Sequence, residues 1–197
     1  MFRPVNADMR LRLPELIEGS GVVLKRWRES DAETLQTAVA ESAEHLRPWM
    51  AWLADEPLSL AQRRAMLARR EQEWLAGGDV MLAVIADGQV AGSCGLHRRR
   101  GPGTLEIGYW IHSSFLRRRL GTTASALLTD AAFTVAGIDH VEIHHDKANV
   151  ASAGIPRRLG FEFVGEQRDE QAAPSDSGID CTWRMSRSAW VAQHDHQ

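Results

Sequence analysis

The chain has few cysteines and no long apolar run. These two absences argue against a disulfide-linked or cysteine-metal protein and against a membrane-spanning one. Its two cysteines, Cys94 and Cys181, lie far apart and match no short-spaced metal or redox pattern. We therefore expect both to be reduced packing residues in a cytoplasmic protein. No segment approaches the roughly 18 consecutive apolar residues that a membrane span needs. Residues 1–18 are broken by prolines and polar residues, so we expect no signal peptide there.

An excess of charge of one sign is also missing. Lys and Arg number 23 and Asp and Glu 26, which gives a formal net charge of −3. This balance, without an RNA or DNA motif, argues against a nucleic-acid partner, whose phosphates attract basic proteins. At roughly 100–200 residues per domain, the length predicts one domain over 1–197. Within it, we expect 1–20 to be an N-terminal extension or first strand and 193–197 a disordered tail.

Local patterns in the first half predict a strand, two helices and three antiparallel strands. Ser30 with Glu33 and Ser59 with Gln62 have the spacing of capping boxes that begin helices. We expect the first helix to end near Leu46 and the second at the glycine pair 77–78. Asp87-Gly88 is typical of a two-residue hairpin turn. The predicted strands cover 21–28, 80–86, 89–97 and 104–112.

The second half predicts two more helices and three more strands. Apolar residues recur at helical spacing between 120 and 137, and the segment 149–159 also has a helical pattern. Pro156 predicts that this second helix begins near Ala153, because proline is tolerated in a first turn. Strands are expected at 140–145, 161–168 and 179–187, and the polar segment 170–178 is expected to be a mobile connection.

The segment 115–124 combines three consecutive arginines with a glycine just before a predicted helix. Free backbone N–H groups at a helix N-terminus bind phosphate oxygens, and Gly121 lets a ligand approach the backbone closely. Nearby arginines add attraction for anions. A solvated basic loop is the alternative interpretation, and spacing alone does not decide between them.

Four motifs, in this order, resemble the GNAT superfamily of acyl-CoA-dependent N-acetyltransferases. The resemblance is to the RimJ/RimL-like branch, which acetylates protein N-termini and some small amines. It implies an α+β fold in which a mixed, mostly antiparallel twisted sheet of about 6–7 strands is flanked by about four helices. The motifs are His45 to Trp52, Glu106 to Trp110, Arg117 to Thr122 and Asn149 to Phe161.

The resemblance implies acetyl-CoA as the cosubstrate, with no metal. The family turn that binds the CoA pyrophosphate falls on Leu116, Arg119 and Gly121, where Leu116 replaces a polar residue and Arg119 a glycine. The strand 107–111 is expected to splay from its neighbour and pair with the pantetheine arm. The implied cofactor-binding residues are Trp110, Ile111, His112, Arg117, Arg118, Arg119, Leu120, Gly121, Thr122, Asn149 and Ser152.

Glu106 is the predicted general base. Alternation places it on one strand face with Trp110, and burial would raise its pKa toward a useful value. The alternative is a rim carboxylate paired with one of the arginines 98–100. Deprotonating a lysine near 10.4 at pH 7 costs roughly 4.6 kcal/mol, whereas an α-amine near 8 needs only roughly 1.4. A weak base therefore suits an N-terminal acceptor.

Many family members use a tyrosine as general acid toward the leaving thiolate, but Pro156 stands at that position. The resemblance offers Ser152 as the donor to the sulfur and Asn149 as a support of the turn or of the pantetheine amide, with helix capping as the alternative. Tyr109, the one tyrosine, would otherwise have to substitute from its strand. The implied acceptor contacts are Trp49, Trp52 and Tyr109.

Histidines give weaker signals. His144 and His145 point to opposite strand faces and have no third ligand at a metal spacing, so we expect no metal site. His97 and His112 end neighbouring strands, where exposure to solvent is the common role and lining the acceptor pocket the alternative.

The sequence thus predicts an N-acetyltransferase that moves an acetyl group from acetyl-CoA to a primary amine, most simply a protein α-amine, by direct attack in a ternary complex. Two alternatives stay open. Arginines 98–100 would favour succinyl-CoA or another acyl-CoA donor if they faced the pocket, and Arg119 would suit an acyl-CoA-binding module without turnover. No membrane partner is expected, and both a monomer and a homodimer are compatible with the chain.

Overall fold

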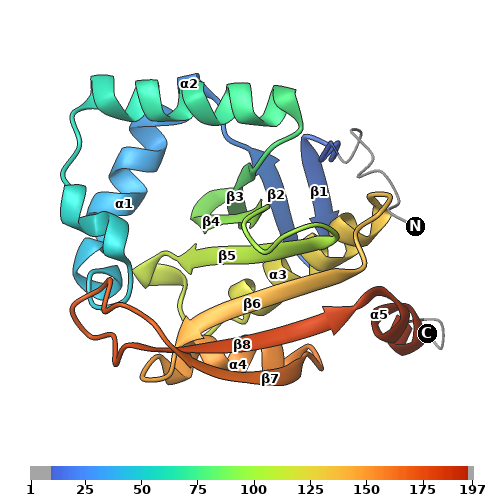
Figure 1. Ribbon diagram of the computed structural model, residues 1–197. Helices are drawn as coiled ribbons and strands as arrows, with labels where there is room; N and C mark the ends of the chain where they lie inside the picture. The colour runs from blue at the N-terminus through green and yellow to red at the C-terminus, as the bar shows by residue number, and fades with distance from the viewer. Residues whose placement is uncertain (1–9, 195–197) are drawn as a thin grey trace.

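The computed structural model describes residues 10–194 as one mixed sheet with helices on both faces (Figure 1). The strand order is β1-β2-β3-β4-β5-β6-β8-β7, and only β5 and β6 run parallel. No helix within the described residues is long and apolar enough to cross a membrane. The strands are β1 (Leu16–Gly19), β2 (Val22–Arg26), β3 (Val80–Ala86), β4 (Gln89–His97), β5 (Thr104–Ile111), β6 (His140–Asp146), β7 (Glu162–Arg168) and β8 (Ile179–Ser186).

Two groups of helices divide the core between the two sheet faces. The first group packs with Ala83 and Trp110 on one face, and the second packs with Leu105 and Ile107 on the other. Because side chains alternate along a strand, neighbouring β5 residues serve different cores. The first group is α1 (Ala32–Leu46) and α2 (Leu60–Ala76), and the second is α3 (Leu120–Thr134), α4 (Val150–Arg158) and α5 (Arg187–His194).

Strands β5 and β6 part from each other halfway along β5. Their pairing runs from Thr104 opposite His140 to Ile107 opposite Ile143. On its other side, β5 stays paired with β4 as far as Ile111. The last four residues of β5 therefore have no pairing with β6, which confirms the expected splay.

Several local predictions are confirmed. Ser59 and Gln62 form the capping box of α2, and Gly77 ends that helix in the left-handed conformation, with φ of 73°. Asp87 and Gly88 both have positive φ, as a type I′ hairpin turn requires. The strands on either side, β3 and β4, have the predicted bounds.

Two predictions about helix starts are wrong. Instead of a Ser30–Glu33 capping box, a short 3-10 helix over Glu29–Asp31 precedes α1, and Asp31 accepts a hydrogen bond from the Arg28 N–H. Helix α4 begins at Val150 rather than near Ala153, so Pro156 lies inside it. Pro156 has no N–H to donate to the Ser152 carbonyl, and a side chain from another element lies beside that carbonyl, as shown below.

The sheet has more strands and the fold more helices than expected, while the fold class is as predicted. Part of the difference lies at the ends of the described chain, where β1 and α5 occur. Gln193 and His194 belong to α5, so their assignment to a disordered tail is wrong, and 195–197 lie outside the described residues. Trp190 anchors α5 because its ring is buried and its Nε1 donates to Asp130.

Candidate active site

The two faces of β5 meet different parts of the protein at the splay. Tyr109 and Ile111 lie on the face of α3 and α4, whereas Glu106 and Trp110 lie on the opposite face. A molecule threaded along the free edge of β5 can therefore be reached from both faces. This geometry suits a reaction between two substrates that arrive from opposite sides.

Ser152 in the first turn of α4 is held by side chains from two elements. Its N–H donates to Oδ1 of Asn149, the N-cap residue, at 3.1 Å. Its Oγ lies 2.8 Å from the Tyr109 hydroxyl, which also lies 3.4 Å from its carbonyl oxygen. Pro156 has no N–H to give that carbonyl, which is the acceptor four residues earlier. The Tyr109 hydroxyl lies beside this carbonyl oxygen, but its closer partner is Oγ of Ser152.

Tyr109 stays protonated at neutral pH. Burial raises its pKa to about 12, although the hydrogen bond with Ser152 acts in the opposite direction. The sequence prediction grouped Tyr109 with the acceptor contacts, and the structure directs its hydroxyl to Ser152. It can therefore donate a hydrogen bond to Oγ of Ser152 and leave the serine proton free for another acceptor.

The basic turn before α3 has an unusual backbone. Arg117 and Arg119 have φ of 61° and 60°, in the left-handed region, and Arg119 is the N-cap residue of α3. Glycine adopts this conformation at the least cost, which explains the glycine of the family pattern at the position of Arg119. Arginine keeps the same backbone geometry here and adds a positive charge.

Gly121 marks a close approach between three elements. A Cβ atom added there would lie 2.8 Å from Cδ1 of Ile155 in α4 and 3.5 Å from Cγ1 of Ile111 in β5. Leu120 beside it is buried in the core and Thr122 is half-buried in the first turn of α3. The helix N-terminus is thus brought against the free end of β5.

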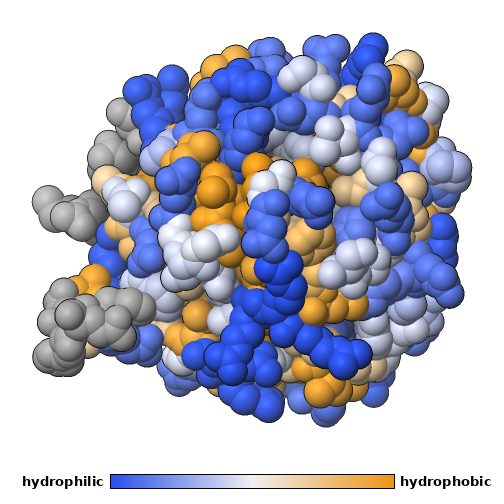
Figure 2. Space-filling model, turned by 180° about the vertical axis from the view of Figure 1, so that it is seen from behind, coloured by the Kyte–Doolittle hydropathy of each residue, from blue (hydrophilic) through white to orange (hydrophobic). Residues whose placement is uncertain are grey.

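The surface on the side of α3 and α4 carries hydrophobic areas separated by hydrophilic side chains (Figure 2). Leu116 in the turn and Val150 at the start of α4 are 39% and 75% exposed. Arg118 is bound to Asp87 of the β3–β4 hairpin at 2.6 Å. Apolar surface beside exposed arginines suits a ligand with an apolar arm and phosphates.

His112 occupies a different position from the arginines. Its Nδ1 accepts from the N–H of Ser114, and its Nε2 lies 2.9 Å from Oε2 of Glu41 in α1. The neutral ring therefore carries its proton on Nε2. Both ring nitrogens are hydrogen-bonded within the protein, one of them to α1. The His112 side chain therefore contacts α1, and only its backbone lies next to the basic turn.

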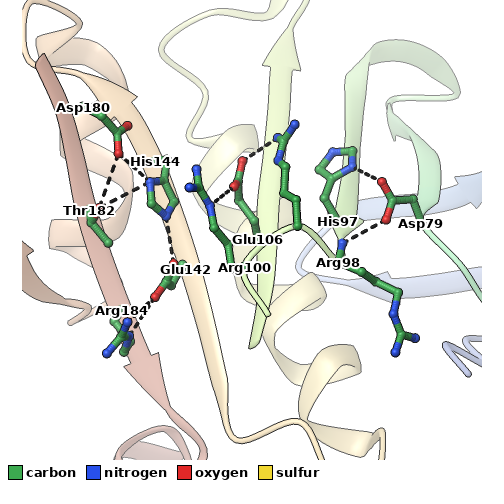
Figure 3. Close-up of polar contacts among 11 residues, drawn as sticks. Asp79, His97, Arg98, Arg100, Glu106, Glu142, His144, Asp180, Thr182 and Arg184 are labelled. Carbon is green, nitrogen blue, oxygen red and sulfur yellow. Dashed lines mark hydrogen bonds and ion pairs between the residues drawn. The ribbon is translucent and has the colours of Figure 1, made fainter. Parts of the chain in front are cut away.

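Glu106 is buried and bound by two arginines from the β4–β5 loop, residues 98–103 (Figure 3). Its carboxylate accepts from the guanidinium groups of Arg99 and Arg100. Burial alone raises its pKa, but the hydrogen bond from Arg99 and the charges of both arginines outweigh that effect and lower it. The expected net rise in the pKa of Glu106 is therefore wrong, and the pairing with arginines that the alternative named is confirmed, although Glu106 is buried rather than at a rim.

A second charged cluster, which sequence reasoning missed, lies on β6 and β8 next to Glu106. Together with Glu106 and His97 it forms a row of polar side chains across the sheet, called the row below (Figure 3). His144 has Nε2 at 2.9 Å from Glu142 and Nδ1 at 2.7 Å from Asp180. Arg184 donates to the other oxygen of Glu142. The two partners lie two and 36 residues away, and Asp180 carries no local signal that points to His144. No group of three or more potential ligands within 10–194 is arranged to hold a metal ion.

His97 at the end of β4 is the remaining polar side chain of this row. Its Nδ1 lies 2.8 Å from Oδ2 of Asp79, and Oδ1 of Asp79 accepts from the Arg98 N–H. A Cβ added at Gly108 would lie 3.1 Å from Nε2 of His97. The imidazole therefore lies against the backbone of β5, at the first residue beyond its pairing with β6.

Aromatic residues and a tethered loop border the same face. The rings of Trp52 and Trp110 are 6.4 Å apart, with Trp52 37% exposed and Trp49 half-buried. The β7–β8 loop, residues 169–178, reaches the segment after α1, where the Ser175 N–H donates to the Pro48 carbonyl (Figure 1).

Asp146 fixes the C-terminal end of the β7–β8 loop, two residues beyond Ser175. Its carboxylate accepts from the N–H groups of Ser177 and Gly178 and from the Ser177 hydroxyl. Desolvation acts to raise its pKa, but these bonds lower it to about 2. The segment expected to be a mobile connection is thus attached at Ser175 and at its junction with β8.

Comparisons with known proteins identify a sequence relative and solved structures of the same fold. YdaF of Bacillus subtilis (strain 168), which is named as a ribosomal N-acetyltransferase, is 28% identical over 152 residues, covering 75% of this chain and 81% of its own. RimL, a ribosomal L7/L12 α-N-protein acetyltransferase solved with coenzyme A, has a TM-score of 0.80 at 19% identity, over 89% of this chain and 99% of its own.

Two further solved structures share the fold. The microcin C7 self-immunity acetyltransferase MccE, solved with acetyl-CoA and AMP, has a TM-score of 0.80 at 18% identity, over 91% of this chain and 99% of its own. A GCN5-related N-acetyltransferase from Brucella melitensis has a TM-score of 0.75 at 25% identity, over 94% and 86%. The sequence pattern of the Acetyltransferase (GNAT) domain matches residues 22–162. The chain therefore belongs to the GNAT acetyltransferase family.

Proposed function

We propose that this protein transfers an acetyl group from acetyl-CoA to a protein N-terminal α-amine. The observation that carries the proposal is the free edge of β5 beyond Ile107, which lies between Ser152 on one face and the row from His97 to Glu106 on the other. YdaF, named as a ribosomal N-acetyltransferase, and RimL, named as an α-N-protein acetyltransferase of ribosomal L7/L12, support this acceptor class. Such an acceptor places the reaction in the cytoplasm.

The CoA half of the substrate fits the side of α3 and α4. Backbone groups along the free edge of β5 can pair with the pantetheine amides, and the N-terminus of α3 with Arg117 and Arg119 suits the pyrophosphate. The small size of Gly121 brings this helix end close to Ile111, so both interactions can be made by one extended molecule.

The acceptor half fits the opposite face. Glu106, whose pKa is lowered, is an anion at neutral pH, and Arg99 and Arg100 bind both of its oxygens, so it forms part of a charged wall on this face. Trp52 and Trp110 supply apolar side chains on this face, and the β7–β8 loop is attached beside them at Pro48.

In the reaction, the amine nitrogen attacks the thioester carbon while the carbonyl oxygen is polarised by free N–H groups of β5. Ser152, oriented by Tyr109, donates a hydrogen bond to the sulfur as the C–S bond breaks. The chain supplies positioning and hydrogen bonds, and no covalent enzyme intermediate is required.

The testing experiment is a thermal-shift and turnover series with acetyl-CoA, succinyl-CoA and free CoA at equal concentrations. A ligand at 100 times its Kd stabilises the native state by about 2.7 kcal/mol. We expect a shift with acetyl-CoA and CoA, and thiol release with acetyl-CoA and a ribosomal-protein N-terminal peptide. The same peptide with a blocked α-amine and an internal lysine is the control.

The two alternatives, a different acyl-CoA donor and a binding module without turnover, each predict a different result in this thermal-shift and turnover series. Turnover with succinyl-CoA alone would replace the acetyl donor. A shift without turnover on any amine would indicate a binding module. The geometry favours neither, because Arg99 and Arg100 are bound to Glu106, and Arg119 already adopts the conformation of the glycine it replaces.

A further inference from the structure

We infer that His97, oriented by Asp79, is the general base that deprotonates the acceptor amine. This assignment rests on the proposed function and names a residue that carries out its first step. It departs from the sequence prediction, which gave that role to Glu106.

The position of the ring is the first argument. Nε2 of His97 lies over Gly108, where only a hydrogen occupies the place of a side chain. Gly108 is the first β5 residue beyond the pairing with β6, so the ring lies beside the start of the free edge. It lies on the face opposite Tyr109 and α4, the face proposed for the acceptor.

The orientation of the ring is the second argument. Asp79 is ionised at neutral pH, because hydrogen bonds from His97 and from the Arg98 N–H lower its pKa despite the opposing effect of burial. A carboxylate only accepts, so Nδ1 of His97 carries the proton of the neutral ring. Nε2 then presents its lone pair, the arrangement that a carboxylate gives a catalytic imidazole.

The surrounding charges are the third argument, and they favour His97 over Glu106 as the general base. Charged groups near the ring are Asp79, Arg70 of α2, the arginines of the β4–β5 loop, and Glu106 opposite His97 on β5. Both oxygens of Glu106 are already bound by Arg99 and Arg100. Within residues 10–194, the hydrogen bonds and ion pairs of the His97 ring are made by Nδ1, and Nε2 faces β5. An imidazole is the commonest general base near neutral pH.

Both protons that the α-ammonium loses in the reaction have an acceptor. Nε2 takes one proton from the α-ammonium, and the freed lone pair forms the C–N bond to the thioester carbon. The C–S bond breaks with its electrons on sulfur, and the second nitrogen proton ends on that sulfur to give the thiol. The imidazolium then returns its proton to solvent.

The test compares His97→Ala with Asp79→Asn and Glu106→Gln on the same peptide and acetyl-CoA. We expect H97A to lower kcat by about 100-fold or more, with an unchanged thermal shift by CoA. Added imidazole should restore part of kcat in H97A in proportion to its concentration. D79N should lower kcat with little change in KM, because the ring loses its orientation. His140→Gln, a half-buried strand histidine at the other end of the β5–β6 ladder, is the control and should match the parent.

The pH profile supplies a readout that a structural role does not change. In H97A, the limb of kcat/KM that belongs to the enzyme base should disappear, while the limb of the peptide amine stays. Full activity of H97A in an active parent overturns this inference alone. Loss of the enzyme limb in Glu106→Gln but not in H97A assigns the base to Glu106. A parent that transfers no acetyl group overturns the proposed function and this role with it.

Discussion

The Tyr109 hydroxyl lies 2.8 Å from Oγ of Ser152, although the two residues are 43 positions apart and belong to β5 and α4. The contact exists because Pro156 interrupts the bonding of α4 at the Ser152 carbonyl and because β5 has no β6 residue beside it at this point. In the proposed reaction, this contact would let a tyrosine of the strand act through Ser152, where the family pattern has a tyrosine on the helix.

This contact predicts that Tyr109 and Ser152 act as a unit. Losing a hydrogen bond to the developing charge on sulfur costs roughly 1.5–3 kcal/mol, so we expect Ser152→Ala to lower kcat by about 10–100-fold. Tyr109→Phe should lower kcat by about 10-fold with little change in KM for acetyl-CoA. The double variant should be no slower than Ser152→Ala.

A double-mutant cycle on kcat checks this prediction. Ser125→Ala, which removes a buried hydroxyl from α3 without a hydrogen-bond partner, is the matched control and should leave kcat unchanged. Multiplying effects of the two single changes would mean that the residues act independently.

The left-handed backbone of Arg119 predicts an unusual order of two substitutions. Both Arg119→Gly and Arg119→Ala remove the guanidinium, so both should weaken CoA binding to the same degree. Only glycine relieves the left-handed conformation, at some cost in chain entropy, so Arg119→Gly should be more stable by about 0.5–1 kcal/mol.

Urea unfolding of the pair measures this difference. The exposed Arg64 within α2 is the control position, where glycine should be less stable than alanine by about 1 kcal/mol. The same order at both positions would contradict the role of the backbone at Arg119.

The charged cluster around His144 predicts stability that is greatest in mildly acidic solution. Burial lowers the pKa of His144, but hydrogen bonds to Asp180 and Glu142 raise it above its ordinary 6.5. Its contribution is therefore fully present below pH 6.5 and is lost as the pH rises through the raised pKa. Asp180 and Glu142 have lowered pKa values, so their contributions are lost as the pH falls below their ordinary 3.8 and 4.5.

Urea unfolding between pH 4 and pH 9 tests this expectation on the parent and on His144→Gln. The free energy of unfolding of the parent should decrease above pH 6.5 more steeply than that of the variant. Equal slopes in this range would show that His144 is not held as an imidazolium by its two carboxylates.

The ion pair of Arg63 and Glu56 predicts a large loss of stability on removal of the carboxylate. The side chains are 3% and 8% exposed, and Glu56 connects the 3-10 helix at Ala51–Asp55 with the start of α2. Glu56→Ala should destabilise the protein by about 3–5 kcal/mol, because a buried guanidinium loses its partner.

Thermal or urea unfolding provides the measurement. Glu33→Ala breaks the exposed pair with Arg64, whose side chains are 73% and 51% exposed, and should cost about 0–1 kcal/mol. A similar small loss in both variants would mean that the buried pair contributes no more than a surface pair.

Sequence patterns were sufficient where neighbouring residues determine the structure. The Ser59–Gln62 box, the Asp87-Gly88 turn and the alternation along β5 involve contacts within a few residues, so their spacing predicts them. The order of motifs was likewise enough to predict the family and the opening of the sheet beside Ile107.

Only the tertiary structure decided the chemistry around the opening. The pKa of Glu106 depends on the positions of two arginine side chains of a loop, and the hydrogen bond of Tyr109 depends on the placement of Ser152 of α4 next to β5. His97 gained its partner from Asp79, 18 positions away, through the pairing of the strands. Charges and hydrogen bonds act through space, so their partners are set by packing between distant segments, which local spacing does not encode.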